Sequence, residues 1–176
     1  MKTLTEENYK RMTGVSGRTP YFTLFVRMVD RCITAVIFLS YPMLLAYMYF
    51  YARTRLVRSI VVPAICFAAV SVFRKIYNAK RPYEVMDFEP IIHKETKGKS
   101  FPSRHVFSVF MIAMTFMQID VMIGAIMLVL GAILAAIRVI GGVHFIRDVV
   151  AGAVLGILGG IVGYYLITFP VIPGIG

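Results

Sequence analysis

Long stretches of this sequence lack any charged residue. They cover residues 33–52, 60–73, 106–119, 121–137 and 149–176. Hydrophobic residues make up 59% of the chain, whereas an ordinary soluble domain contains roughly 45–50% apolar residues. The missing charges exclude an ordinary soluble domain, and the charge-free runs predict several membrane-spanning helices.

Acidic residues and cysteines are also scarce. The 9 Asp and Glu residues stand against 19 Lys and Arg residues, which gives a net charge of +10. A nucleic-acid-binding protein would not need these apolar runs, so we expect no nucleic-acid partner, and anionic lipid headgroups or phosphorylated substrates explain the basic excess better. The two cysteines, Cys32 and Cys66, lie beside or inside apolar runs, which argues against a disulfide framework.

The N-terminal region, residues 1–31, lacks a run long enough to cross a membrane. Its first 19 residues are polar, and residues 21–31 mix apolar residues with two arginines and one aspartate. Because residues 20–51 are too few for two crossings of roughly 20 residues each, we predict a tail and an interfacial helix within residues 1–31. No signal-peptide pattern accompanies the first apolar run, so we expect the first spanning helix to be retained.

Residues 32–176 are predicted to form a transmembrane bundle, within a single domain that covers residues 1–176. The fold class is all-α, a polytopic membrane helix bundle with helices at about residues 32–52, 56–77, 106–118, 120–137 and 143–168. One straight helix over residues 106–137 would be roughly 48 Å long, against a hydrocarbon core of ~30 Å. This run is therefore expected to fold back near Asp120.

The predicted helix order places four helix ends on one face of the membrane, beside the polar loop of residues 78–101. These ends carry most of the polar residues of the bundle, which are Arg74, Lys75, Lys80, Arg81, Ser103, Arg104, His105, Arg138, His144 and Asp148. Because the third and fourth predicted helices are short, we expect this cluster to lie at the depth of the lipid headgroups.

His144 and Asp148 are four residues apart on the predicted last helix, so their side chains face the same side. A carboxylate on one imidazole nitrogen fixes the tautomer and leaves the other nitrogen unprotonated, which suits a nucleophile or a base. The alternative interpretation is a polar pair at a helix end that faces lipid headgroups.

The basic residues on this face have two interpretations. A guanidinium binds phosphate oxygens in a bidentate way and stabilises a phosphoryl group during transfer. The candidates for this role are Arg74, Arg81 and Arg138, supported by Lys75, Lys80 and Arg104. Basic residues at helix ends also bind anionic lipids and orient a membrane protein. This second interpretation is favoured for Lys75, Lys94, Lys97 and Lys99.

The stretch "FPSRH", residues 101–105, stands where the polar loop meets the third apolar run. Pro102 predicts a helix start, because proline is favoured in the first turn, and the free N–H groups of that turn attract phosphate. Ser103 adds a hydroxyl, and His105 could protonate a leaving oxygen. A metal site is not expected, since no two of the three histidines share ligand spacing on one helix.

Three blocks of residues together resemble the signature of the type 2 phosphatidic acid phosphatases, which are related to bacterial acid phosphatases and vanadium haloperoxidases. The blocks are Arg74-x6-Arg81-Pro82, Pro102-Ser103-Arg104-His105 and Arg138-x5-His144-x3-Asp148. They follow the order of the family over residues 74–148. Each block alone is a weak signal, whereas the combination is very specific.

The resemblance implies a division of labour among these residues. His144 would attack phosphorus and form a phosphohistidine, Asp148 would orient it, and His105 would protonate the leaving group and then activate water. No metal or other cofactor would be needed. The residues that would cradle the phosphate are Arg74, Arg81, Ser103 and Arg138, with Arg104 as an additional contact.

Three positions depart from the pattern of the family. Arg74 replaces the usual lysine, which keeps the charge but not the point geometry of an ammonium group. Arg104 replaces the usual glycine and could add a phosphate contact or recognise a second phosphate. Ile137 replaces the usual serine, which removes one hydrogen bond. None of the three is a catalytic residue in this assignment.

The number of helices and the orientation follow partly from the resemblance. The apolar runs give five spanning helices, whereas membrane members of the family typically have six, so we expect about five to six here. Basic residues near the active-site face favour a cytoplasmic site, whereas many bacterial relatives are thought to work on the outer face, and both orientations stay open. Glycines at small-xxx-small spacing in the last helix indicate close packing within the bundle or, alternatively, a homodimer.

We therefore expect a multi-pass protein of a bacterial cell membrane that hydrolyses a phosphomonoester or diphosphate of a lipid in the same bilayer. By the resemblance, the candidate lipids are phosphatidic acid, phosphatidylglycerol phosphate and an isoprenyl diphosphate such as undecaprenyl diphosphate. One alternative is a lipid phosphotransferase that uses the same site. The other is a non-catalytic protein that binds or transports lipid headgroups.

Overall fold

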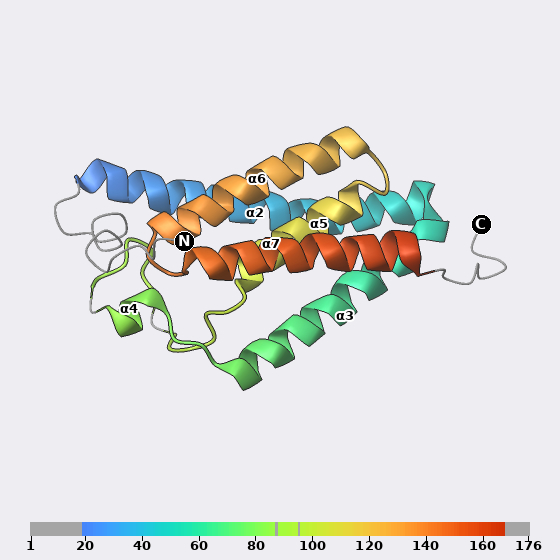
Figure 1. Cartoon of the computed structure of the whole chain (residues 1–176). Coiled ribbons are helices and arrows are strands. Elements are labelled where there is room, and N and C mark those ends of the chain that lie inside the picture. The colour runs from blue at the N-terminus through green and yellow to red at the C-terminus, as the bar shows by residue number, and fades with distance from the viewer. Residues whose placement is uncertain (1–18, 87, 95, 168–176) are drawn as a thin grey trace.

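Helices form the regular structure of the described chain (Figure 1). The computed structural model describes residues 19–86, 88–94 and 96–167, so the predicted tail lies outside it up to residue 18. The helices of this part are α2 (Pro20–Tyr51), α3 (Arg53–Tyr77), α4 (Pro82–Val85), α5 (Arg104–Phe116), α6 (Val121–Ile140) and α7 (Ile146–Ile161), which continues as a π-helix (Val162–Leu166). The all-α fold is confirmed.

Four stretches are long and apolar enough to cross a membrane. They are Pro20–Tyr51, Arg53–Val85, Val121–Ile140 and Ile146–Leu166. Large apolar side chains stay exposed along their outer surfaces, as lipid contact requires. The protein is therefore a multi-pass membrane protein, as the charge-free runs predicted.

Helix α5 lies at the centre of the bundle (Figure 1). It contacts α2, α3, α6 and α7, and all of its residues from Val106 to Phe116 are buried. Its 13 residues give a length of about 20 Å at 1.5 Å per residue, which is less than the ~30 Å hydrocarbon core. The segment before α5 must therefore reach into the bundle to meet it, and this segment carries Ser100 and Ser103.

The predicted fold-back near Asp120 is confirmed. Helix α5 ends at Phe116, and Asp120 is the N-cap of α6, with its carboxylate accepting a hydrogen bond from the Ile123 N–H at 2.9 Å. A charged side chain at this turn satisfies an N–H group that the first turn of a helix leaves free.

The prediction of a separate interfacial helix before Arg31 is wrong. Helix α2 runs without a break through 32 residues, from the Thr19 N-cap and Pro20 to Tyr51. Its charged residues are used inside the protein, because Arg27 Nε donates to the Ile91 carbonyl at 2.6 Å and Asp30 pairs with Arg138. The charges that suggested a membrane surface therefore mark contacts with the loop and with α6.

Two predicted helix starts also shift. Pro102 does not lie in the first turn of α5, because Ser103 is the N-cap and the helix begins at Arg104. Helix α7 begins at Ile146 and not near residue 143, because the Asp148 carboxylate accepts from the Phe145 N–H and caps the helix there. Each shift moves one candidate residue, Ser103 or His144, from a helix into the segment just before it.

Glycines let α7 approach the central helix closely. A Cβ atom on Gly152 would lie 2.6 Å from the Ser103 carbonyl oxygen, and one on Gly156 would lie 2.8 Å from the Phe107 carbonyl oxygen. Larger side chains would push the helices apart. Close packing within the bundle thus accounts for these glycines, and the homodimer remains a prediction.

Candidate active site

His144 and Asp148 meet at the start of α7, as their spacing predicted. The His144 Nδ1 atom lies 3.4 Å from Asp148 Oδ2, and the two residues are 1% and 0% exposed. The same oxygen accepts from the Phe145 N–H at 3.1 Å. Because the carboxylate faces Nδ1, it favours the tautomer with the proton on Nδ1 and leaves Nε2 as the basic nitrogen.

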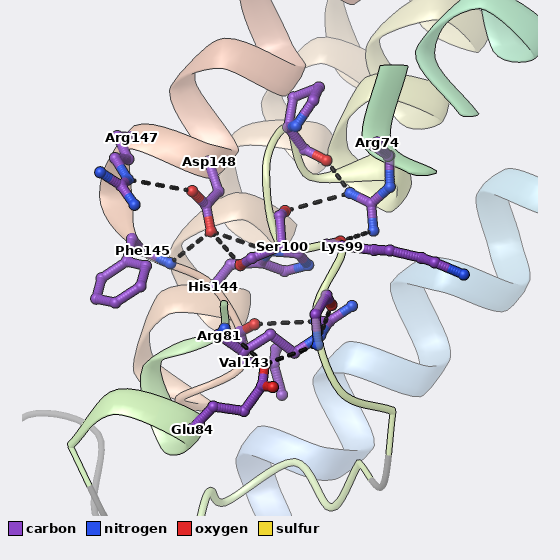
Figure 2. Close-up of polar contacts among 12 residues, drawn as sticks. Arg74, Arg81, Glu84, Lys99, Ser100, Val143, His144, Phe145, Arg147 and Asp148 are labelled. Atoms are coloured by element: carbon purple, nitrogen blue, oxygen red, sulfur yellow. Dashed lines mark hydrogen bonds and ion pairs between the residues drawn. The ribbon is translucent and has the colours of Figure 1, made fainter. Parts of the chain in front are cut away.

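Ser100 joins this pair, and the sequence analysis missed it. Its Oγ donates a hydrogen bond to Asp148 Oδ2 and lies 3.4 Å from His144 Nδ1. Figure 2 shows the three side chains together at the start of α7. The Asp148 carboxylate is thus held by a hydroxyl and a backbone amide, and it in turn fixes the imidazole.

Burial keeps His144 neutral. Desolvation lowers the pKa of His144 to about 4, although the hydrogen bond that Nδ1–H donates to Asp148 acts in the opposite direction and the charge of Arg81 adds to the lowering. A histidine with this pKa is unprotonated at neutral pH, which is the state that a nucleophile requires.

A turn of two glycines delivers His144 to this position. Gly141 and Gly142 follow α6, and Gly142 has a φ of +76°, which L side chains rarely adopt. A Cβ atom there would also lie 2.7 Å from the Phe88 ring. The sharp reversal therefore requires glycine at this position.

The loop of residues 78–101 closes on itself and so returns Ser100 to the end of α3. The Ser100 N–H donates to the Ala79 carbonyl at 2.8 Å, and the Lys99 N–H donates to Asn78 Oδ1 at 3.2 Å. Arg81 Nε donates to the Gly98 carbonyl at 3.0 Å. These contacts, together with Ile91, which is buried against Val26 and Ile137, fix the loop beside His144 and Asp148.

Arg74 and Arg81 brace the backbone around the site. The buried Arg74 guanidinium donates to the carbonyl of Ser100 at 3.2 Å and also to the carbonyls of Lys99 and Pro102 (Figure 2). Arg81 Nη1 donates to the Val143 carbonyl at 3.1 Å, next to His144. Three hydrogen bonds of Arg74 thus go to the segment that carries Ser100, and its role as a phosphate ligand stays a prediction.

Arg138 is held by an acidic residue that the sequence analysis did not assign. Its Nε lies 2.8 Å from Asp30 Oδ1, and both side chains are buried. The two groups are not aligned for a hydrogen bond, so this contact is an ion pair. Arg138 donates no hydrogen bond to any residue in the described ranges.

Ser103 has an unsatisfied hydroxyl. Its N–H donates to the Asp148 carbonyl at 2.8 Å, but its fully buried Oγ has no hydrogen-bond partner among the described residues. It lies at the N-terminus of α5, where the first N–H groups of a helix are free. A buried hydroxyl beside free N–H groups favours an anionic ligand.

The other predicted residues are less closely joined to this cluster. His105 is half-buried, its ring centroid lies 6.3 Å from that of Phe38, and it interacts electrostatically with Arg138 and His144. Arg104 is exposed and its guanidinium lies over the Phe67 ring at 5.5 Å. Lys75 and Lys80 are also exposed.

No set of three or more His, Cys, Asp or Glu side chains gathers as a metal-ligand group in the part of the chain that the structure describes. The cluster is instead cationic, with one buried carboxylate on the histidine and another on Arg138. Such an arrangement is suited to binding an anion beside a nucleophilic nitrogen.

Comparisons with known proteins agree with this arrangement. The sequence profile of the PAP2 superfamily matches residues 54–171. The crystal structure of Aquifex aeolicus LpxE is similar, with a TM-score of 0.71 and 22% identity over 92% of this chain and 95% of that chain. The first transmembrane PAP2 type phosphatidylglycerolphosphate phosphatase from Bacillus subtilis gives a TM-score of 0.69 and 24% identity over 90% and 81%. Curated protein sequences give no significant match.

The similar crystal structures and the profile match support different conclusions. Identities of 22% and 24% show that the fold is shared. The profile match covers more than half of the 176 residues and includes all three sequence blocks, from Arg74 to Asp148. The chain belongs to the PAP2 superfamily.

Proposed function

We propose that this protein is a membrane lipid phosphatase that cleaves a phosphomonoester or a diphosphate of a lipid through a phosphohistidine. The observation that carries this proposal is the buried, neutral His144, held by Asp148 and Ser100 inside a cluster of cationic groups. A merely structural polar pair would not need a nucleophilic nitrogen surrounded by buried arginines.

The phosphate is proposed to bind between α5, α6 and His144. The Ser103 Oγ and the free N–H groups at the start of α5 provide neutral donors. Arg138 provides charged donors, and Asp30 holds it in place from α2. Because these groups lie on rigid helices, they are preorganised for the negative charge that spreads over the transferring phosphoryl group.

In the first step, the Nε2 lone pair of His144 forms a bond to phosphorus as the bond to the leaving oxygen breaks. His105, protonated in the presence of the bound phosphate anion, gives its proton to that oxygen, so the lipid alcohol or lipid monophosphate departs carrying this proton. Asp148 stabilises the positive charge that develops on the imidazole, in the way a triad carboxylate does.

In the second step, water attacks the phosphohistidine. His105, now unprotonated, takes one proton from the water as its oxygen bonds to phosphorus, and the N–P bond electrons return to Nε2. Inorganic phosphate leaves, and both histidines regain their starting states. Each of these steps uses side chains of the chain itself.

The position of the site supports a lipid as substrate. The catalytic residues lie at the ends of membrane-spanning helices, and α5 is too short to raise its N-terminus far above the bilayer core. A phosphate at headgroup depth could therefore reach them directly from the bilayer. Phosphatidic acid, phosphatidylglycerol phosphate and undecaprenyl diphosphate are all candidates, and the similar Bacillus subtilis protein, a phosphatidylglycerolphosphate phosphatase, supports this class.

Phosphate release by the detergent-solubilised protein tests the proposal. The panel comprises these three lipids, with and without EDTA and with an alcohol acceptor in a parallel sample. We expect release without added metal, inhibition by vanadate, and loss of release in His144→Ala and His105→Ala.

The matched control is His93→Ala, which removes the third histidine from an exposed position in the loop. This variant should keep the wild-type rate. Undiminished release in His144→Ala would overturn the mechanism, and transfer to the alcohol in place of release would identify a phosphotransferase.

A further inference from the structure

A lysine-rich pocket lies beside the catalytic cluster, and the mechanism above makes no use of it. Its volume is about 440 Å³, and it is lined by Lys80, Tyr83, Glu84, Lys94 and Lys97. This size falls within the ~300–1,000 Å³ of typical small-molecule sites. Such sites are mostly apolar, whereas this one is lined by three lysines, so it is suited to an anionic group.

The walls of this lysine pocket are held in place by hydrogen bonds. Glu84 Oε2 accepts from the Arg81 N–H at 2.7 Å and from the Gly98 N–H at 2.8 Å, and the Tyr83 hydroxyl donates to the Thr96 carbonyl at 2.6 Å. The Glu84 carboxylate is therefore used by backbone amides. The pocket therefore carries three ammonium groups against one carboxylate, which leaves a net positive charge for a ligand.

Lys94 connects the pocket with the catalytic cluster. Its half-buried ammonium group has no hydrogen-bond or ion-pair partner among the described residues. Burial, together with the charges of Arg81, Arg138, Arg74 and Arg104, lowers the pKa of Lys94 to about 8. Lys94 also interacts electrostatically with both catalytic histidines and with one carboxylate, that of Asp30, which is already paired with Arg138. A half-buried ammonium among like charges is unfavourable unless an anion joins it.

We propose that the pocket of Lys80, Lys94 and Lys97 is a second anion subsite, which binds a phosphate group of the substrate other than the one attacked by His144. This inference rests on the proposed function. The site would then prefer a lipid whose headgroup carries two phosphate groups over a simple lipid monophosphate. Lys94 would contact the second phosphate from the loop, while Arg138 and Ser103 hold the first.

The test compares farnesyl diphosphate with farnesyl monophosphate, which share one apolar chain and differ by one phosphate group. For Lys94→Met we expect kcat/KM for the diphosphate to fall about 10- to 100-fold, mainly through KM, since a charge-assisted hydrogen bond is lost. The value for the monophosphate should change less than about threefold. Lys94→Arg should keep most of the preference, because it keeps a charged donor.

The control variant is Lys99→Met, which removes one charge from an exposed position in the same loop. The Lys99 side chain points away from His144 and Asp148 (Figure 2), so both substrates should keep their wild-type values. Equal losses for both substrates in Lys94→Met would overturn the subsite, because Lys94 would then bind the attacked phosphate. No loss for either substrate would also overturn it.

A binding measurement tests the second anion subsite independently of the proposed phosphatase activity. Isothermal titration of His144→Ala with the two farnesyl phosphates should show at least about tenfold tighter binding of the diphosphate, and Lys94→Met in that background should remove the difference. If added phosphatidylglycerol abolishes the difference at constant detergent, the pocket holds a neighbouring lipid headgroup and the proposal is wrong. A wild-type protein that binds with this preference but releases no phosphate would contradict the phosphatase and not the subsite.

Discussion

Arginine side chains do different work at the two ends of the bundle. At the end away from the site, Arg58 Nε and Nη2 donate to the carbonyls of Gly163 and Ile167, both at 2.9 Å, and Arg53 Nε donates to the Tyr49 carbonyl at 2.8 Å. These side chains are exposed or half-buried, and they satisfy carbonyls that the last turn of a helix leaves free.

At the end with the candidate active site, the arginines are buried and their partners belong to the segments that form this site. Arg74 and Arg81 hold the backbone around Ser100 and His144, and Arg138 pairs with Asp30. At one end, arginines therefore bind free carbonyls at the ends of helices, and at the other end they hold the residues of the candidate site in place. Burial and the identity of the acceptor distinguish the two uses, and paired substitutions at the two ends test the difference.

The largest difference in activity is expected between the Asp→Asn variants at positions 148 and 120. Asp148→Asn should lower kcat by ~10⁴-fold, because an amide does not hold the imidazole in the productive tautomer or stabilise its positive charge. Asp120→Asn should keep full activity, since asparagine is an equally good N-cap for α6. Initial rates on a lipid phosphate decide this, and more than a tenth of wild-type activity in Asp148→Asn would argue against the role of the carboxylate.

The Asp30 and Arg138 ion pair should give the next largest effect. Asp30→Asn leaves Arg138 buried without its carboxylate, so we expect kcat/KM to fall about 10- to 100-fold and unfolding to become easier by about 3 kcal/mol. Weaker inhibition by vanadate would distinguish a misplaced arginine from a general loss of stability.

Arg58→Gln is the counterpart at the other end. It removes two hydrogen bonds to the last turns of the α7 region, so it should lower the melting temperature slightly and leave the inhibition constant of vanadate unchanged. A similar change of this constant in both variants would mean that Asp30 acts through stability alone.

Substitutions of two buried hydroxyl groups should have smaller effects, one on activity and the other on stability. Ser103→Ala should lower kcat/KM about tenfold without loss of stability, because its Oγ has no partner among the described residues. Thr115→Val should keep activity but cost about 1 kcal/mol of stability, because it breaks the 2.8 Å hydrogen bond to the Tyr164 hydroxyl. Initial rates and thermal unfolding in detergent are measured for both variants. Lost stability in Ser103→Ala together with lost activity in Thr115→Val would contradict the prediction.

The smallest effect is a pH dependence from Lys94. Because its pKa is lowered to about 8 by burial and by the charges of Arg81, Arg138, Arg74 and Arg104, the ammonium group is charged below this pH and neutral above it. Its charged fraction falls from about 0.9 at pH 7 to about 0.25 at pH 8.5, so KM for farnesyl diphosphate should rise about fourfold. Lys94→Arg stays charged and should remove this rise, and a rise that persists in the variant would assign it to another group.

Local features of the sequence determined the spanning helices, the fold-back between two of them and the pairing of His144 with Asp148. Charge-free runs gave the spanning helices, because charged side chains are costly in a hydrocarbon core. The mismatch between the length of residues 106–137 and the bilayer gave the fold-back at Asp120. The four-residue spacing brought His144 and Asp148 together even though His144 lies before the helix and not on it.

Contacts between distant segments were decided by the tertiary structure alone. Ser100 reaches Asp148 because the loop closes on the end of α3, and Asp30 reaches Arg138 because α2 continues past the membrane core beside α6. Lys94 faces the arginines for a similar reason. Spacing along a chain predicts neighbours within one helix. Which loop residue meets which helix end depends on how the helices pack, and that packing placed a serine, an aspartate and a lysine around the two histidines.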